Sequence, residues 1–197
     1  LDEPRYAEAA EKAAMFVLTK LRTKDGRLLK RFRQGDASLP AHLDDYAFMI
    51  WGLTELYEST FDINYLQEAL GLNKLMIEQF WDPEKGGFYM TARDGEQLLV
   101  RPKEIYDGAI PSGNSVAAFN LLRLGRITVQ PDLETKASML MASFAGQVNQ
   151  APSAHAFLMS ALSFAVGSSF EIVIAGDPRG ERYRKNAGRA LRSIYPQ

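Results

Sequence analysis

The sequence predicts an all-α protein made of helical hairpins in two layers, with small β-hairpins inserted between them. The composition is that of a globular protein, with 46% hydrophobic and 24% charged residues among 197. Seven segments have helical periodicity, and they alternate between amphipathic and almost wholly apolar. An amphipathic helix exposes one face, whereas an apolar helix is buried on every side. The alternation therefore indicates an outer and an inner layer of helices.

The predicted outer helices each carry a polar face and comprise 4–21, 62–80, 131–149 and 179–193. The predicted inner helices are apolar and comprise 45–58, 115–124 and 156–166. A solenoid of helix pairs could show the same alternation. The period of any sequence repeat distinguishes such a solenoid from two layers of helical hairpins. At an offset of 68 residues, Leu53 falls on Leu121 and Leu56 on Leu124. This match favours duplication of one helix pair over a short-period array.

Turn signals between the helices predict short β segments. Gly86-Gly87 and Asp94-Gly95 flank extended runs, which predicts a hairpin of 87–92 with 97–101. A turn-and-strand excursion is expected at 25–32 and a strand at 169–177. Tyr89 lies in the first of these segments, where it could face a ligand or pack beneath the loop.

A proline-containing turn with short polar residues precedes each inner helix. If the inner helices run parallel, their N-termini meet at one face and form a polar mouth. These residues could simply be N-caps. Asp44 and Asp45 fit that interpretation less well, because adjacent carboxylates repel unless a ligand, a cation or the helix dipole offsets them. The mouth would hold His42, Asp44, Asp45, Ser112, Asn114, Ser115, Ser153 and His155.

Such a mouth suits a sugar-like polyol, because carboxylates accept hydroxyl protons, amides donate and accept, and aromatic rings cover C–H faces. Asp45 and Asp107 are the candidate acid and base for glycoside hydrolysis, with Asp44 as an alternative to Asp45. Epimerisation would instead need His42 and His155 as bases at carbon. His42 is accordingly kept among the candidate catalytic residues. The candidate substrate-binding residues are Asp44, Tyr46, Tyr89, Lys103, Tyr106, Ser112, Asn114 and Ser115.

Charge and composition argue against several other functions. A net charge of -1 gives no electrostatic case for nucleic acid or an anionic membrane, and no apolar run of 18 residues exists. Without cysteine there is no thiolate metal site or disulfide, which favours a cytoplasmic protein. No spacing indicates a metal or a cofactor. The chain begins without Met or a leader, so we expect a fragment of a longer protein.

Three stretches together resemble a known family: "HLDDYAFMIWGLTELYE", "YDGAIPSGNSVAAFNLLRL" and "FEIVIAGD". They are similar to the helical region of the YyaL or spermatogenesis-associated protein 20 family, in which a thioredoxin-like domain precedes an (α/α)6 six-hairpin toroid. The resemblance implies that 1–197 is a partial toroid and that the thioredoxin-like domain is absent. The family's motif positions fall here on Asp44, Asp45, Tyr46, Asp107, Ser112, Gly113, Asn114 and Ser115.

Sugar epimerases and unsaturated glucuronyl hydrolases have similar toroids, but a fold does not transfer an activity. The first hypothesis is a carbohydrate-active domain, hydrolase or epimerase in type, with a sugar-like ligand. The alternatives are a non-catalytic scaffold that binds a protein or peptide and serves a thioredoxin-like domain, and a helical-repeat adaptor. An incomplete ring would expose apolar flanks, so self-association or contact with the remainder of the protein is also expected.

Overall fold

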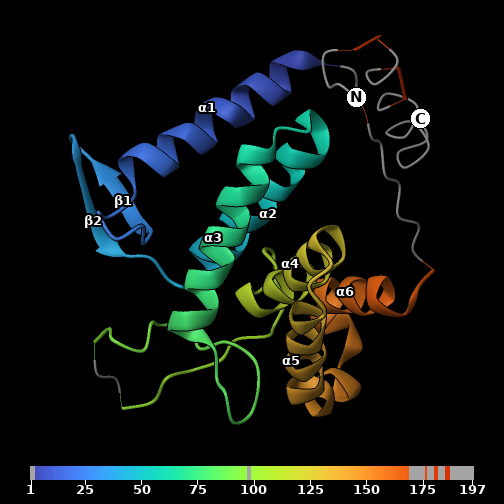
Figure 1. Ribbon diagram of the computed structural model, residues 1–197. Coiled ribbons are helices and arrows are strands. Elements are labelled where there is room, and N and C mark those ends of the chain that lie inside the picture. Colours follow the sequence, from blue (N-terminus) through green and yellow to red (C-terminus); the bar gives the residue numbers. More distant parts are fainter. Residues whose placement is uncertain (1–2, 97–98, 169–175, 177–179, 182–184, 187–197) are drawn as a thin grey trace. The chain divides into compact units, whose positions relative to one another are not determined.

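The computed structural model describes residues 3–96, 99–168, 176, 180–181 and 185–186 (Figure 1). The chain divides into two compact units, residues 1–166 and 167–197. The predicted strand at 169–177 and the predicted helix at 179–193 fall in the second unit, largely outside the described residues. All of the candidate site residues lie in the first unit.

The described residues of this first unit include six α-helices, and each coincides with a predicted helix (Figure 1). Extensive contacts join α2 to α3 and α4 to α5 as two hairpins, and α4 also packs against α2 and α6. The three apolar helices thus form one layer with α4 in the middle. A short 3-10 helix, η1 (Pro152–His155), leads into α6. The helices are α1 (Pro4–Lys20), α2 (Leu43–Thr60), α3 (Ile63–Phe80), α4 (Gly113–Thr128), α5 (Pro131–Gln150) and α6 (Ala156–Val166).

The core lies between the two layers, and the predicted duplication matches residues that are buried alike. Leu53 of α2 and Leu121 of α4, which are 68 residues apart, are both fully buried. The last apolar helix, α6, differs from the prediction, because only Leu158 and Ala161 of it are buried. Among the described helices only α4 packs extensively on α6, and Met159, Leu162 and Val166 of α6 are exposed.

The first β insertion forms as expected and is longer than predicted. Strands β1 (Leu29–Arg33) and β2 (Asp36–Pro40) pair antiparallel, with Arg31 opposite Ser38. Gln34 and Gly35, at the turn, have φ of 51° and 84°, the left-handed pair that a tight two-residue hairpin requires.

The second predicted hairpin, of 87–92 with 97–101, is wrong for the described residues. Phe88 instead forms a bridge with Trp81, and the Met90 N–H bonds to the Pro102 carbonyl at 2.9 Å, but no strand ladder joins the described residues of 87–92 and 97–101. Gly86 and Gly87, both at positive φ, turn the chain so that Phe88 is fully buried. The Asn114 side chain then bonds both backbone groups of Phe88, which replaces pairing with a second strand.

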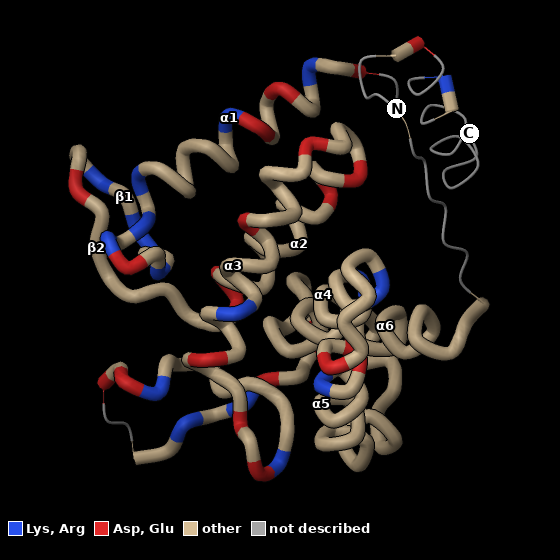
Figure 2. The backbone as a smooth tube through the Cα atoms, in the orientation of Figure 1, with Lys and Arg blue, Asp and Glu red and all other residues tan. Residues whose placement is uncertain are grey.

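Charges of both signs are interspersed along α1 and the loops, and α6 carries none (Figure 2). Within the described residues, no helix combines the length and hydropathy needed to cross a membrane.

Candidate functional site

The N-termini of α2, α4 and α6 meet, as the sequence predicted. Asp107 makes the link between α4 and α6: its Oδ1 accepts from the Ser112 N–H at 2.9 Å, and its Oδ2 from the Phe157 and Leu158 N–H groups at 2.8 and 3.1 Å. Asp44, in the first turn of α2, lies against Gly113 at the start of α4. Two carboxylates therefore lie beside consecutive residues at the N-terminus of α4.

Asp107 serves as a helix cap. Both of its carboxylate oxygens accept from backbone N–H groups that would otherwise lack partners at the starts of α4 and α6. Its own N–H donates to the Ala154 carbonyl at 2.9 Å, which fixes the loop before α4 on η1. These contacts give Asp107 a positioning role.

Asp45 and His42 form a second cap, at the start of α2. Asp45 Oδ2 accepts from the His42 N–H at 2.8 Å, which leaves its Oδ1 available. The Lys30 ammonium lies 3.2 Å from His42 Nδ1, and an ammonium can only donate, so Nδ1 accepts and the ring proton is on Nε2. His155 is buried, with Nδ1 2.9 Å from the Ile105 carbonyl, to which it donates.

Asp44 differs from Asp45 and Asp107 in the bonding of its carboxyl group. Its Oδ1 is shielded from water and makes no hydrogen bond of standard geometry. Burial raises the pKa of Asp44; the nearby N–H of Gly113 offsets part of that rise, and the charge of Asp45 adds to it. A carboxyl group with these properties can hold a proton that a neighbouring carboxylate has lost, which is what a general acid requires.

Several predicted substrate-binding residues support the loop before α4. Asn114 is fully buried; it accepts from the Phe88 N–H and donates to the carbonyls of Phe88 and Glu104, at 2.7 to 2.9 Å. Ser112 caps α4 by accepting from the Ser115 N–H, and its hydroxyl donates to the Ser115 hydroxyl at 3.0 Å. These side chains lie at the mouth, but their polar atoms form hydrogen bonds within the protein.

Tyr89 and Lys103 come together on Asp82, a residue that the sequence showed only as part of a turn. Lys103 donates to Asp82 Oδ2 at 2.6 Å and the Tyr89 hydroxyl does so at 2.8 Å. Burial opposes ionisation of Asp82, but Lys103, the Lys85 N–H and Tyr89 outweigh it and hold the pKa of Asp82 well below its usual range. Its burial and its distant lysine were not visible in the sequence. The cluster braces the α3–α4 loop.

Tyr46 and Tyr106 differ most from the expected arrangement. The Tyr46 side chain is 2% exposed, and its hydroxyl accepts from the Leu28 N–H at 3.0 Å. Two residues along a helix differ by about 200° in direction, so Tyr46 and Asp44 point to opposite sides of α2. Tyr106 is 60% exposed and keeps its ring free beside Asp107.

Below the mouth, partly exposed aromatic rings from all three inner helices touch one another. Trp51 of α2 lies 4.9 Å from Phe157 of α6, although α4 separates these helices, and Phe119 of α4 lies 5.7 Å from Phe157. The three rings therefore share one face of the layer. Asp44, Phe48 and Trp51 are spaced i, i+4, i+7, so this face continues into the mouth. The sequence analysis missed this row, which only the packing of three helices reveals.

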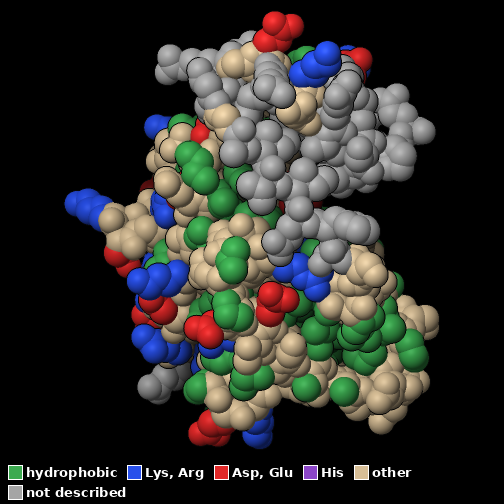
Figure 3. Space-filling view, turned by 45° about the vertical axis from the view of Figure 1, so that its right-hand side comes forward, with side chains coloured by type: hydrophobic (Ala, Val, Ile, Leu, Met, Phe, Trp, Pro, Cys, Tyr) green, Lys and Arg blue, Asp and Glu red, His purple; other side chains and the backbone are tan. Residues whose placement is uncertain are grey.

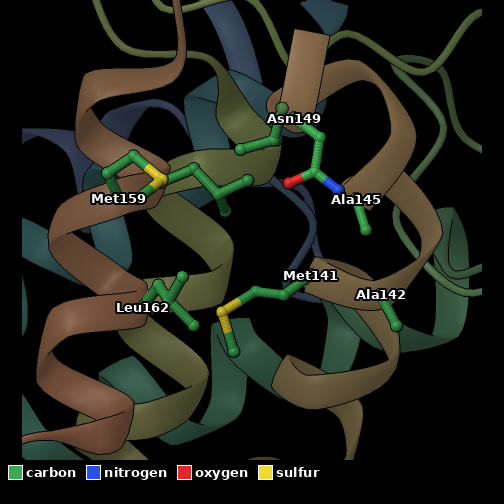
Figure 4. A pocket seen from close by; sticks show the side chains of 8 residues that line it. Met141, Ala142, Ala145, Asn149, Met159 and Leu162 are labelled. Carbon is green, nitrogen blue, oxygen red and sulfur yellow. The ribbon is translucent and has the colours of Figure 1, made fainter. Parts of the chain in front are cut away.

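Another hollow, of about 250 Å³, lies between α5 and α6 (Figure 4). Met141 of α5 and Leu162 of α6 point toward one another across it, and Asn149 is the single polar side chain in its lining. Figure 3 shows hydrophobic side chains gathered over this part of the molecule. Because it lacks convergent polar groups, this groove is not a polyol site.

A metal site is not formed in the described part of the chain, where no three His, Asp or Glu side chains are grouped to hold an ion.

Solved structures define the class of fold. A GH76 alpha-mannanase from Bacteroides thetaiotaomicron matches 74% of this chain over 39% of its own, with a TM-score of 0.58 and 19% identity. A possible GH105 member from Salmonella enterica serovar Paratyphi A matches 98% of this chain over 53% of its own, with a TM-score of 0.51 and 15% identity. The chain therefore has the fold of an (α/α)6 six-hairpin toroid, of which its described helices form only a part. Identities this low show the fold alone.

Curated relatives then give the family. Spermatogenesis-associated protein 20 of rat is 38% identical over 154 residues, which are 78% of this chain and 19% of the relative. The human protein is 34% identical over 179 residues (86% and 23%), and an uncharacterized Caenorhabditis elegans protein is 32% identical over 189 (91% and 25%). The predicted resemblance to the spermatogenesis-associated protein 20 family is confirmed over most of this chain. It spans about a fifth to a quarter of these relatives' lengths, and no protein-family model matches it.

Proposed function

We propose that the mouth formed by α2, α4 and α6 binds a sugar-like ligand and that this is a carbohydrate-active domain, hydrolase or epimerase in type. The observation that carries the proposal is the shielded, unpartnered Oδ1 of Asp44 between α2 and α4. The fold shared with a GH76 alpha-mannanase is consistent with it but gives no activity.

In this proposal Asp44, rather than Asp45 or Asp107, is the acid. A glycosidase needs one carboxyl group that donates a proton to the leaving oxygen and another that acts as base or nucleophile. Asp45, with Oδ1 available, is the second group. Asp107 holds the helix N-termini in place, since both of its oxygens are bonded to the backbone. For epimerisation, His42 is the base: Nδ1 of its neutral ring would take the proton from a carbon of the sugar, in place of the bond from Lys30.

The aromatic row supports a sugar over a charged metabolite. Trp51, Phe119 and Phe157 form an apolar surface that continues from Asp44 along α2. Aromatic faces cover the C–H surfaces of sugars, while the carboxyl groups at the mouth bind hydroxyls. Tyr106, exposed at the rim, adds a further aromatic surface.

A thermal-shift screen of the full-length protein tests this function. The panel comprises mono- and disaccharides, uronic acids and N-acetyl sugars, each assayed with wild type, Asp44→Asn and Asp62→Asn. Asp62 caps the outer helix α3 by accepting from the Asn64 N–H, which Asn can also do, so it is a matched control. A bound sugar should raise the Tm of wild type and of the control, but not of Asp44→Asn. An equal shift in Asp44→Asn would contradict the assignment.

A non-catalytic scaffold is the second candidate, and one observation favours it. Asp107, Asn114, Ser112 and Lys103, all predicted to act on or bind a substrate, are engaged in contacts that hold the fold. Absence of a Tm shift with every sugar in the panel would favour this scaffold, and a protein or peptide ligand would then be sought.

A further inference from the structure

A second cavity, of about 260 Å³, lies between the β1–β2 segment and the α2–α3 hairpin. Its walls include Leu28, Pro40, Tyr46, Gln79 and Phe80. Since Tyr46 points to the opposite side of α2 from Asp44, this cavity is separate from the mouth. Nothing in the proposed function accounts for it.

Two buried polar side chains line this cavity with hydrogen-bonding capacity unused. Gln79 is 8% exposed, and its side-chain oxygen, Oε1, is shielded from water and makes no hydrogen bond to any residue that the structure describes. Tyr46 accepts from the Leu28 N–H, but its own hydroxyl proton has no acceptor among the described residues. A buried amide without a partner destabilises the fold, so the pair calls for an occupant that bonds to both.

We propose that this cavity binds a small neutral molecule that carries hydroxyl groups. The Tyr46 hydroxyl supplies a donor, and the Gln79 amide presents either its oxygen or its nitrogen after a half-turn that preserves its shape. A hydroxyl group, which both donates and accepts, matches this pair. Leu28, Pro40 and Phe80 supply the apolar walls that a carbon skeleton needs.

Charge and size narrow the occupant further. Arg27, the one cation in the lining, is paired with Asp94 at 2.5 Å and with Asp25 at 3.5 Å, so it offers little to an anion. The volume is below the roughly 300–1,000 Å³ typical of pockets for drug-sized ligands. Burial also raises the pKa of the Tyr46 phenol, which therefore stays a donor near neutral pH. A compact, uncharged polyol fits these constraints.

The test uses the full-length protein with myo-inositol and glycerol as probes and inorganic phosphate as the charged control. Ligand-observed NMR is expected to show binding of a neutral probe and none of phosphate. Gln79→Leu should weaken that binding at least about tenfold, the effect of losing one buried hydrogen bond. Because Leu replaces an unpartnered amide, the Tm of this variant should be unchanged or higher.

Two further measurements make the result decisive. Asp44→Asn, at the mouth, should leave binding of the neutral probe unchanged, so failure of the proposed sugar site would not affect this result. Crystals soaked in the probe should show it in contact with Tyr46 and Gln79. Ordered water alone in the cavity at a saturating probe concentration, or equal affinity in Gln79→Leu, would overturn the proposal.

Discussion

At the scale of single residues, the contact between Asp44 and Gly113 explains why glycine begins α4. A Cβ at 113 would overlap Asp44 Oδ1 and lie 2.9 Å from Leu43 Cγ. We expect Gly113→Ala to lower the free energy of unfolding by about 1–3 kcal/mol, measured by urea denaturation, because packed neighbours must move. Gly52→Ala is the control, since Gly52 is exposed on α2 with no atom near its Cβ, and it should stabilise the helix.

Steric overlap with Asp44, rather than loss of backbone freedom, should account for this cost. Adding Asp44→Ser to Gly113→Ala shortens the opposing side chain and should recover part of the lost stability, so the two effects will not be additive. Additive effects would contradict the contact.

The raised pKa of Asp44 predicts how its replacement changes stability with pH. A carboxyl group whose pKa is higher in the folded state stabilises the fold below its unfolded pKa, and this contribution is lost as pH rises through the folded value. At pH 7 this contribution is absent, and Asp44 lowers the stability of the fold relative to a carboxyl group whose pKa does not change. Asp44→Asn should raise the Tm at pH 7, and the gain should shrink as the pH falls below about 4. A gain that is the same at both pH values would show that Asp44 is not the strained group.

At the scale of elements, the α3–α4 loop is ordered by one side chain rather than by a hairpin. Asn114→Ala would leave the backbone groups of Phe88 and the Glu104 carbonyl without their partners. We expect a loss of about 2–3 kcal/mol in urea denaturation, together with faster proteolysis between 82 and 108. Asn64→Ala, at an exposed position, should change stability by no more than about 0.5 kcal/mol. Unchanged proteolysis in Asn114→Ala would rule out this role.

The helices could be predicted from the sequence because their periodicity is local, and all six within 1–166 were found. The two β segments differ in whether their structure depends on local or on distant residues. The turn at Gln34-Gly35 specifies its own hairpin, whereas Phe88 bonds to Asn114, 26 residues away, and no local pattern contains that contact. Turn signals at Gly86-Gly87 were interpreted correctly as turns, but the runs beside them lacked a partner strand.

At the scale of the whole first unit, the two-layer arrangement of the helices could be predicted from the sequence, whereas the hydrogen bonding of each carboxyl group could not. Glu55 and Arg123, which also differ by 68, form an ion pair at 2.6 Å between equivalent positions of α2 and α4. The convergence of three helix N-termini followed from the order of the elements. Which aspartate stays free depends on Asp107 capping α6 from 50 residues away, and that contact exists only in the folded chain.

The open side of α6 leads to a prediction about association. Met159 and Leu162, which line the α5–α6 groove (Figure 4), are 37% and 38% exposed. Val166, at the end of α6, is 79% exposed. Exposed apolar surface of this kind favours contact with another protein surface. When the 197-residue chain is purified by itself, the other surface available is a second copy, so we expect self-association in light scattering.

Variants in the groove locate that contact. Leu162→Glu places a charge where an apolar partner would pack and should shift the chain toward monomer. Ser160→Glu adds the same charge at an exposed position of α6 outside the groove lining and should leave association unchanged. A wild-type chain that is a monodisperse monomer would contradict the prediction. Equal effects of the two substitutions would show that net charge, and not the groove, controls association. Both substitutions add the same charge to α6, and they differ only in whether they lie in the groove.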